Sequence, residues 1–106
     1  MTSASDLLLE TNEDGDTAAV TVHGSLEAAT ADELRRQLRF LIDSGHGRLD
    51  LDLADVWFLD GDGVGVLVGA LKAQESAGGQ LIVTATSPLV RRVLHIAGLD
   101  RLVAGG

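Results

Sequence analysis

The chain lacks cysteine and tyrosine altogether, and it contains only two phenylalanines and one tryptophan among 106 residues. Without cysteine it can form neither a disulfide framework nor a thiolate metal site, and it has no cysteine nucleophile. Aromatic side chains are scarce although 45% of the residues are hydrophobic, so the core must be built from Leu, Val, Ile and Ala. The length is that of one compact domain, which we expect to span residues 1–106.

Positive charge is also scarce, because 8 Lys and Arg residues stand against 16 Asp and Glu residues, which gives a net charge of -8. Such a field repels nucleic acid and anionic lipid, so we expect no nucleic-acid partner. Arg35, Arg36 and Arg39 form one basic cluster at helical spacing, and we interpret it as a solvated helix face.

No apolar run approaches the length of a membrane span, so we expect no direct insertion into a membrane. The small polar residues 1–6 lack the pattern of a signal peptide and are expected to be a loose end, which favours a cytoplasmic protein.

The hydrophobic periodicity predicts strands over residues 7–11, 17–23, 48–53 and 80–85, and a short final strand within 99–103. Helical spacing predicts one helix beginning at Thr30, a second after Gly63, and a third beginning with Ser87 as N-cap and Pro88 as first residue. The order is therefore β-β-α-β-α-β-α-β. This is an α/β fold with a mixed, mostly parallel sheet of about five strands.

Two local patterns refine this prediction. Thr30 and Glu33 match a capping box, with residues 24–29 as the loop before the helix. In residues 48–53 leucine alternates with aspartate, so Asp50 and Asp52 share one face of a strand. We interpret that face as solvated rather than as an acid–base pair or a metal site, because no third ligand stands at suitable spacing.

Residues 53–70 are the stretch around which the chain is organised. An extended apolar segment leads through Asp60, Gly61, Asp62 and Gly63 into an apolar helix. Such a turn exposes the first amides of the helix and can hold a phosphate or dock a partner. The alternative is that the acidic residues only cap the helix. Gly65 and Gly69 each cost about 1 kcal/mol inside a helix, which favours close packing against the sheet or, alternatively, the approach of a partner.

Several kinds of chemistry are excluded. The glycine run places Val66 where a dinucleotide fingerprint needs its third glycine. A calcium loop counted from Asp60 has Val64 and Leu71 where oxygen ligands are required. His23, His46 and His95 are scattered in the sequence, and no nucleophile elbow is present. We therefore expect no enzyme activity, no metal and no cofactor.

Three stretches together resemble the STAS family, whose members include bacterial anti-sigma-factor antagonists. Residues 22–27 followed by Thr30 and Ala31 resemble the family's "GELD…TA", and residues 49–67 resemble its hydrophobic strand followed by "FLDSSGLGVL". Residues 84–94 with 97–99 form the third stretch, and the resemblance covers roughly residues 8–103. It implies a STAS fold and a protein that regulates transcription by binding an anti-sigma factor, a serine-kinase-like ATPase.

The resemblance also implies where the partner binds, namely the turn 60–63, the exposed face of the following helix and the adjacent loop with Gly24, Ser25, Leu26 and Glu27. Antagonists of this family are phosphorylated on the residue directly after the aspartate that Asp60 matches. Gly61 occupies that position and carries no hydroxyl, so the usual phosphorylation site is absent.

Asp62 supplies a permanent negative charge next to that position and could mimic a phosphate only in part. Three alternatives follow: the protein binds its partner constitutively, it is held permanently in a non-binding form, or it has a different partner. A hydroxyl elsewhere, on Ser25, Thr30 or Ser87, is a further alternative site of modification. Alternative functions are a STAS subunit of a membrane complex that transports lipid or anions, and a small-ligand sensor or cryptic enzyme.

Overall fold

The computed structural model describes residues 7–104, and the segment 1–6, expected to be a loose end, lies outside the described residues. A single sheet has the strand order β1-β2-β3-β4, with β1 antiparallel to β2 and the other two pairings parallel. The elements are, in order, β1 (Leu7–Asp14), β2 (Thr17–Leu26), α1 (Ala28–Asp43), β3 (Arg48–Leu59), α2 (Gly61–Ser76), β4 (Gln80–Thr86), α3 (Pro88–Ile96) and a 3₁₀ turn η1 (Asp100–Leu102).

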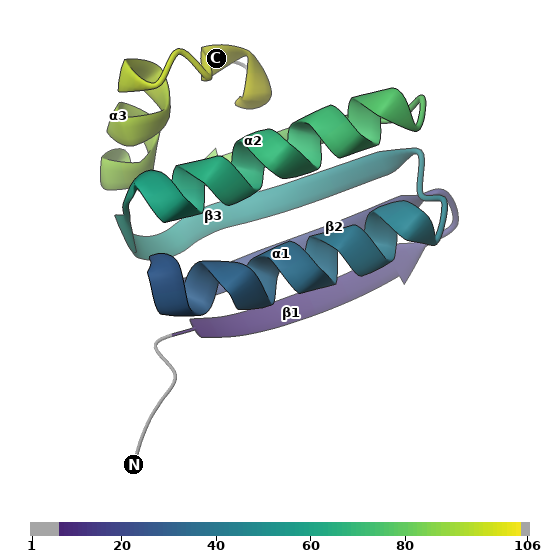
Figure 1. Ribbon diagram of the computed structural model, residues 1–106, viewed down its shortest axis with the longest axis horizontal. Coiled ribbons are helices and arrows are strands. Elements are labelled where there is room, and N and C mark those ends of the chain that lie inside the picture. Colours follow the sequence, from purple (N-terminus) through teal and green to yellow (C-terminus); the bar gives the residue numbers. More distant parts are fainter. Residues whose placement is uncertain (1–6, 105–106) are drawn as a thin grey trace.

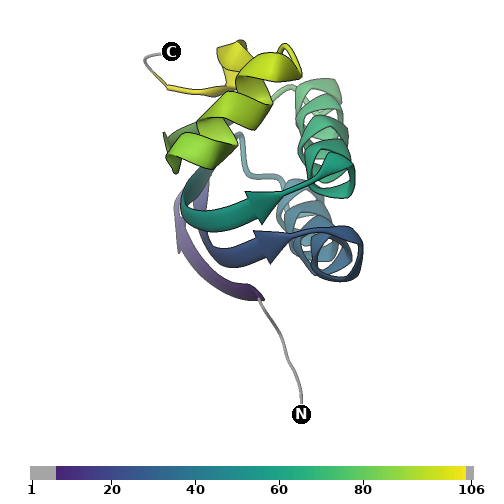
Figure 2. The same ribbon diagram turned by 90° about the vertical axis from the view of Figure 1, so that its left-hand side faces the viewer.

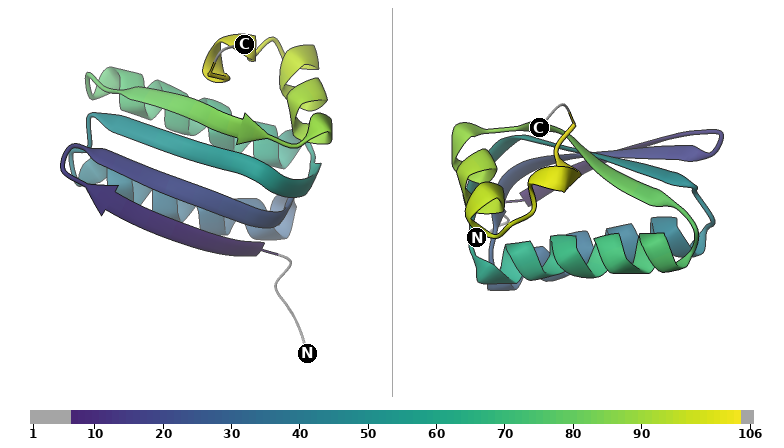
Figure 3. Two further views of the ribbon diagram at one scale, coloured as in Figure 1. Left: turned by 180° about the vertical axis from the view of Figure 1, so that it is seen from behind. Right: turned by 90° about the horizontal axis from the view of Figure 1, so that it is seen from above.

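The helices α1 and α2 lie side by side on one face of the sheet (Figure 1), and the opposite face is not covered by either (Figure 3). Figure 2 shows the same two layers end-on, with α3 set at the end of the sheet. The strand β3 pairs with β4 only as far as Leu53, and α3 follows at that point, where the Ser87 hydroxyl donates to the Val56 carbonyl at 2.7 Å. The predicted order of elements is confirmed as far as α3, and so is the α/β fold with a mixed, mostly parallel sheet.

The final strand expected within residues 99–103 is reduced to a single parallel bridge between Val103 and Val83. The residues before it form η1, because this turn buries Leu102 in the core and leaves only Val103 and Ala104 to reach β4. The sheet therefore has 4 strands rather than five full ones.

The start of α1 also differs from the expectation. The N-cap is Glu27 rather than Thr30, and Thr30 stands three residues into the helix, where its hydroxyl accepts a hydrogen bond from the Glu27 amide at 3.1 Å. The capping box thus has its acidic residue first and its threonine second, the reverse of the usual order. The reason is that β2 continues to Leu26, since its last residues pair with the end of β3, and this shortens the loop.

The core is aliphatic, as the composition predicts. Leu49, Leu51 and Leu53 of β3 point toward the helices and are buried, whereas Asp50 and Asp52 lie on the other face of the sheet and are half-buried. All three aromatic side chains are exposed, by 61% for Phe40, 62% for Trp57 and 41% for Phe58. No helix within residues 7–104 is long and apolar enough to cross a membrane.

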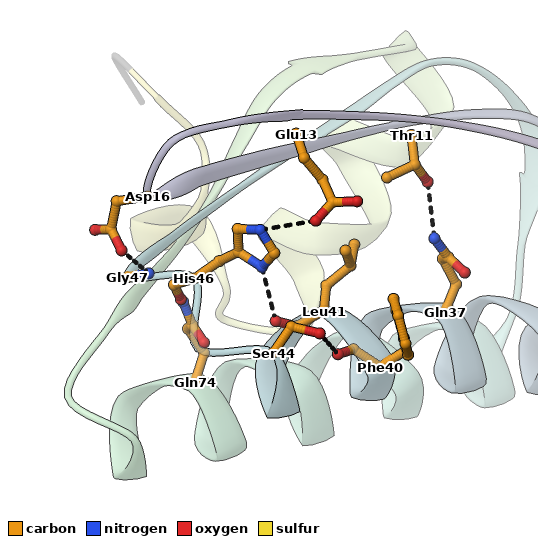
Figure 4. A network of polar contacts seen from close by, with 10 residues as sticks. All are labelled: Thr11, Glu13, Asp16, Gln37, Phe40, Leu41, Ser44, His46, Gly47 and Gln74. Carbon is orange, nitrogen blue, oxygen red and sulfur yellow. Dashed lines mark hydrogen bonds and ion pairs between the residues drawn. The ribbon is translucent and has the colours of Figure 1, made fainter.

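A polar network ties the turns together at the end of the sheet where α1 and α2 finish (Figure 4). Gln74 of α2 is fully buried, and its amide nitrogen donates to the carbonyls of His46 at 2.7 Å and Gln80 at 3.3 Å. The His46 ring contacts Glu13 of β1 and the Leu41 carbonyl of α1, each at 3.0 Å. This network fixes both helices at one end, and the opposite end is where both helices begin.

Candidate functional site

The candidate site, residues 24–27 and 60–63, lies at the carboxyl ends of the parallel strands β2 and β3. Leu26 and Leu59 are paired in the sheet, and the Asp60 amide donates to the Leu26 carbonyl at 3.2 Å. The two stretches are therefore adjacent although more than thirty residues separate them in the chain. The carboxyl ends of parallel strands are where α/β proteins generally bind their ligands.

Asp60 is the N-cap of α2. One of its carboxylate oxygens, Oδ1, accepts hydrogen bonds from the amides of Asp62 at 2.9 Å and Gly63 at 3.2 Å. These are two of the amides that a helix leaves without an intrahelical partner at its start. The expected alternative of an acidic N-cap is thus what the structure shows for Asp60, and both of the cap's hydrogen bonds go to Oδ1.

Gly63 is buried and allows the two strands and the helix to approach one another. A Cβ atom at this position would lie 2.8 Å from the carbonyl oxygen of Leu26 and 2.9 Å from its Cβ, closer than real contacts allow. The glycine therefore holds the start of α2 against the end of β2.

Gly61 and Asp62 form the exposed surface of the site. A Cβ atom on Gly61, the residue that follows the N-cap, would meet nothing within 4 Å. The first turn of α2 therefore has open space beside this residue. Asp62 is exposed, and within residues 7–104 neither Asp60 nor Asp62 takes part in an ion pair. The turn therefore carries negative charge that no cation of the described part of the chain compensates.

The other stretch of the candidate site is mostly buried. The Ser25 and Leu26 side chains are fully buried, and the Ser25 hydroxyl donates to a carboxylate oxygen of Glu27 at 3.1 Å. Gly24 has a φ of 123°, a backbone conformation that glycine adopts readily. Of these four residues, Gly24 and Glu27 are half-buried, whereas Ser25 and Leu26 are buried and help to position the backbone.

The hydroxyls considered as alternative sites of modification all make hydrogen bonds. Thr30 donates to the Ser25 carbonyl at 2.6 Å, and Ser87 donates to the Val56 carbonyl while it accepts from the Val90 amide at 3.3 Å. Phosphorylation of Ser25, Thr30 or Ser87 would break contacts that hold the start of α1 or α3.

The two glycines inside α2 do not serve close packing on the sheet, so that expectation is wrong. A Cβ atom on Gly65 or Gly69 would meet nothing within 4 Å, and both residues are exposed. They lie along the gap between α1 and α2, beside Arg35 and Arg39 of α1. The open space beside them leaves the α2 backbone accessible at these two positions.

Each of the three histidines has a carboxylate partner that the sequence did not indicate. On the open face of the sheet, the Nδ1 atom of His23 lies 2.7 Å from Asp55 and the Nε2 atom lies 2.7 Å from Glu10. The hydrogen bond with Glu10, followed in importance by the one with Asp55, raises the pKa of His23 above its ordinary value. His46 contacts Glu13, and His95 contacts Asp100.

These pairs do not make a metal site, because no group of three or more His, Asp or Glu side chains in residues 7–104 is placed to hold a metal ion.

An apolar groove beside the candidate site was not predicted. It has a volume of about 380 Å³ and lies between the first turns of α2 and the second half of α3. Its lining is Leu59, Asp60, Gly61, Val64, Val93, Ile96 and Ala97. A signal for it exists in the sequence, because Val93 and Ile96 are one helical turn apart on a face adjacent to the buried residues Val90 and Leu94.

Comparisons with known proteins agree with this arrangement. The family model described as "Mlab, STAS domain" matches residues 9–104. An anti-sigma-B factor antagonist of Staphylococcus epidermidis is 32% identical over 98 residues, which cover 92% of this chain and 91% of that protein. An anti-sigma F factor antagonist of Paenibacillus polymyxa is 31% identical over 85 residues, or 79% of this chain and 73% of that protein.

Solved structures show the same fold. An anti-sigma factor antagonist from Mycobacterium paratuberculosis superimposes with a TM-score of 0.83 at 26% identity, over 97% of this chain and 88% of that one. The murine anion transporter Slc26a9 shares the fold at 20% identity, with a TM-score of 0.72 over 87% of this chain and 16% of that one. Since the family model and the relatives span nearly the whole chain, the protein belongs to the STAS domain family.

Proposed function

We propose that this protein is an anti-sigma-factor antagonist, which regulates transcription in the cytoplasm by binding an anti-sigma factor and performs no catalysis. The observation that carries the proposal is the likeness to anti-sigma-B factor antagonists over 92% of the chain. The binding surface is the turn with Asp60, Gly61, Asp62 and Gly63, the exposed face of α2 with Gly65 and Gly69, and the accessible atoms of Gly24 and Glu27.

We further propose that binding is constitutive. In the antagonists that this chain resembles, a kinase phosphorylates the residue directly after the capping aspartate. Gly61 stands at that position and has no hydroxyl. Asp62 is a poor substitute for a phosphate, because it carries one charge rather than about -1.5 to -2. It is also displaced by one residue, which turns its side chain by roughly 100° around the helix axis. Position 61 itself thus gains no phosphate charge and stays open.

The test is to measure binding of this protein to each purified anti-sigma factor of its own host by calorimetry, with and without ATP. We expect the wild type to bind in both conditions. Gly61→Ser fits the open space at this position, so it should bind without ATP and lose affinity once the kinase has phosphorylated it. Gly61→Ala is the matched control, since it adds a Cβ without a hydroxyl and should bind in both conditions. Failure of the wild type to bind any of these anti-sigma factors would refute the proposal.

A second candidate function is a STAS subunit of a membrane transport complex. It is favoured by the description of the matching family model, "Mlab, STAS domain", and by the fold that the chain shares with part of a murine anion transporter. Co-purification of the chain with a transport ATPase or a permease, in place of an anti-sigma factor, would support this candidate over the first.

A further inference from the structure

The groove between α2 and α3 combines an apolar floor with an exposed rim. Leu59 is buried, while Val64 and Val93 are half-buried and pack against the core from α2 and α3. Ile96 forms the rim and is 74% exposed, more than any other large hydrophobic side chain in residues 7–104. Leu89, seven residues earlier on the same face of α3, is also exposed. An apolar surface with an exposed rim buries its hydrophobic area when a partner side chain enters it.

The charge at one end of the groove limits what can occupy it. Asp60 and Gly61 line that end, and Asp62 follows on the exposed side of α2. Neither carboxylate is paired with a cation anywhere in the described part of the chain. An anionic occupant would be repelled, and a purely apolar one would leave these charges without a counter-charge. The occupant that complements both features has an aliphatic anchor and a cationic group close to it.

The groove is open along its length and continuous with the candidate site. The absent side chain at Gly61 leaves a path from the exposed turn into the groove, since a Cβ there would meet nothing within 4 Å. Its volume of about 380 Å³ is at the low end for pockets that enclose small ligands, and its walls come from two helices. Helices commonly insert side chains into a groove of this kind.

From this arrangement we propose that the α2–α3 groove receives a helix of the partner, which places a branched aliphatic side chain between Val64, Val93 and Ile96 and an arginine or lysine one turn away against Asp60 and Asp62. This inference deepens the proposed function, since it names the chemistry of the partner segment at the same site. It predicts that anchoring depends on Ile96 and that its salt dependence comes from Asp62.

The probe is a synthetic helical peptide of about 20 residues, long enough to be partly helical in water, with one leucine and an arginine four positions later. It is titrated into the isotopically labelled full chain, and the amide signals are followed by NMR. We expect shifts at Gly61, Val64, Val93 and Ile96. Ile96→Ser should weaken binding about tenfold, because it removes the apolar side chain that would cover the partner's aliphatic anchor. Phe40→Ser is the matched control, because Phe40 is equally apolar and 61% exposed but lies on α1, and it should bind as the wild type does.

Two matched peptides test the chemistry. Replacing the leucine by alanine should abolish the shifts, and replacing the arginine by glutamate should weaken binding at low salt. Absence of shifts at these amides, or equal binding of the arginine and glutamate peptides, would overturn the inference.

The outcome is separable from that of the proposed function. If an anti-sigma factor binds the wild type and Ile96→Ser equally well, the groove proposal fails and the function stands. If the peptide binds in the groove but no anti-sigma factor of the host binds, the groove proposal stands and the function fails.

Discussion

Replacing Gly63 by alanine tests whether the candidate site is built by the close approach of α2 to β2. The added Cβ would lie 2.8 Å from the Leu26 carbonyl oxygen. This oxygen cannot move freely, because it accepts the hydrogen bond from the Asp60 amide, and the Leu26 side chain is fully buried. Overpacking of a well-packed site costs roughly 1–3 kcal/mol, and a backbone obstacle places this case near the upper value. Alanine regains up to about 1 kcal/mol of helix propensity, so the net loss of stability is about 2 kcal/mol.

The assay is thermal denaturation followed by circular dichroism, and the matched control is Gly61→Ala in the same turn. Its Cβ meets nothing within 4 Å, so we expect it to be neutral or slightly stabilising. Gly63→Ala should lower the melting temperature by about 10 °C relative to that control. It should also weaken partner binding, since it separates the two stretches of the site. Equal stability of the two variants would show that the turn relaxes, and the argument that Gly63 sets the site geometry would be refuted.

Three other perturbations have defined outcomes. Because the pKa of His23 is raised, its contacts with Glu10 and Asp55 stabilise the fold fully below pH 6.5, the ordinary value, and this stabilisation is lost as the pH rises through the raised pKa. His23→Gln should remove this pH dependence of the unfolding free energy, measured by urea titrations between pH 5.5 and 9. An unchanged pH profile in the variant would contradict the argument. Gly65→Ala and Gly69→Ala should each stabilise the fold by up to about 1 kcal/mol, because their Cβ atoms meet open space. Both substitutions should also weaken binding of the anti-sigma factor. Unchanged affinity would show that this face of α2 is not part of the binding surface. Gln74→Ala should cost about 2 kcal/mol, because Gln74 is fully buried and the carbonyls of His46 and Gln80 lose its amide as a donor. Thermal denaturation against the half-buried control Gln37→Ala would measure this cost.

Features that depend on neighbouring residues were predicted well. Ser87 and Pro88 begin α3 as expected, with the Ser87 hydroxyl accepting from the Val90 amide. The alternation of leucine and aspartate in residues 48–53 correctly separated the buried from the outer face of β3. These outcomes follow from periodicity and capping, which act within one or two turns of the chain.

Features that depend on strand register were predicted poorly. The register between β2 and β3 extends β2 to Leu26, and this moved the N-cap of α1 from Thr30 to Glu27. The final strand was shortened because burial of Leu102 in η1 competes with pairing to β4. Local propensity contains neither the register nor the competition for core space, so neither outcome was available from the pattern.

The amino-acid sequence by itself determined the order of the elements, the aliphatic core, the acidic cap at Asp60 and the absence of a hydroxyl at Gly61. Only the tertiary structure decided which glycines are constrained, since Gly63 faces Leu26 whereas Gly61, Gly65 and Gly69 face open space. It also decided that Ile96 and Val64, far apart in the chain, share one groove, and that His23 meets two carboxylates. The physical reason is that composition and periodicity act locally, whereas steric room, grooves and charge pairs arise only when distant segments pack together.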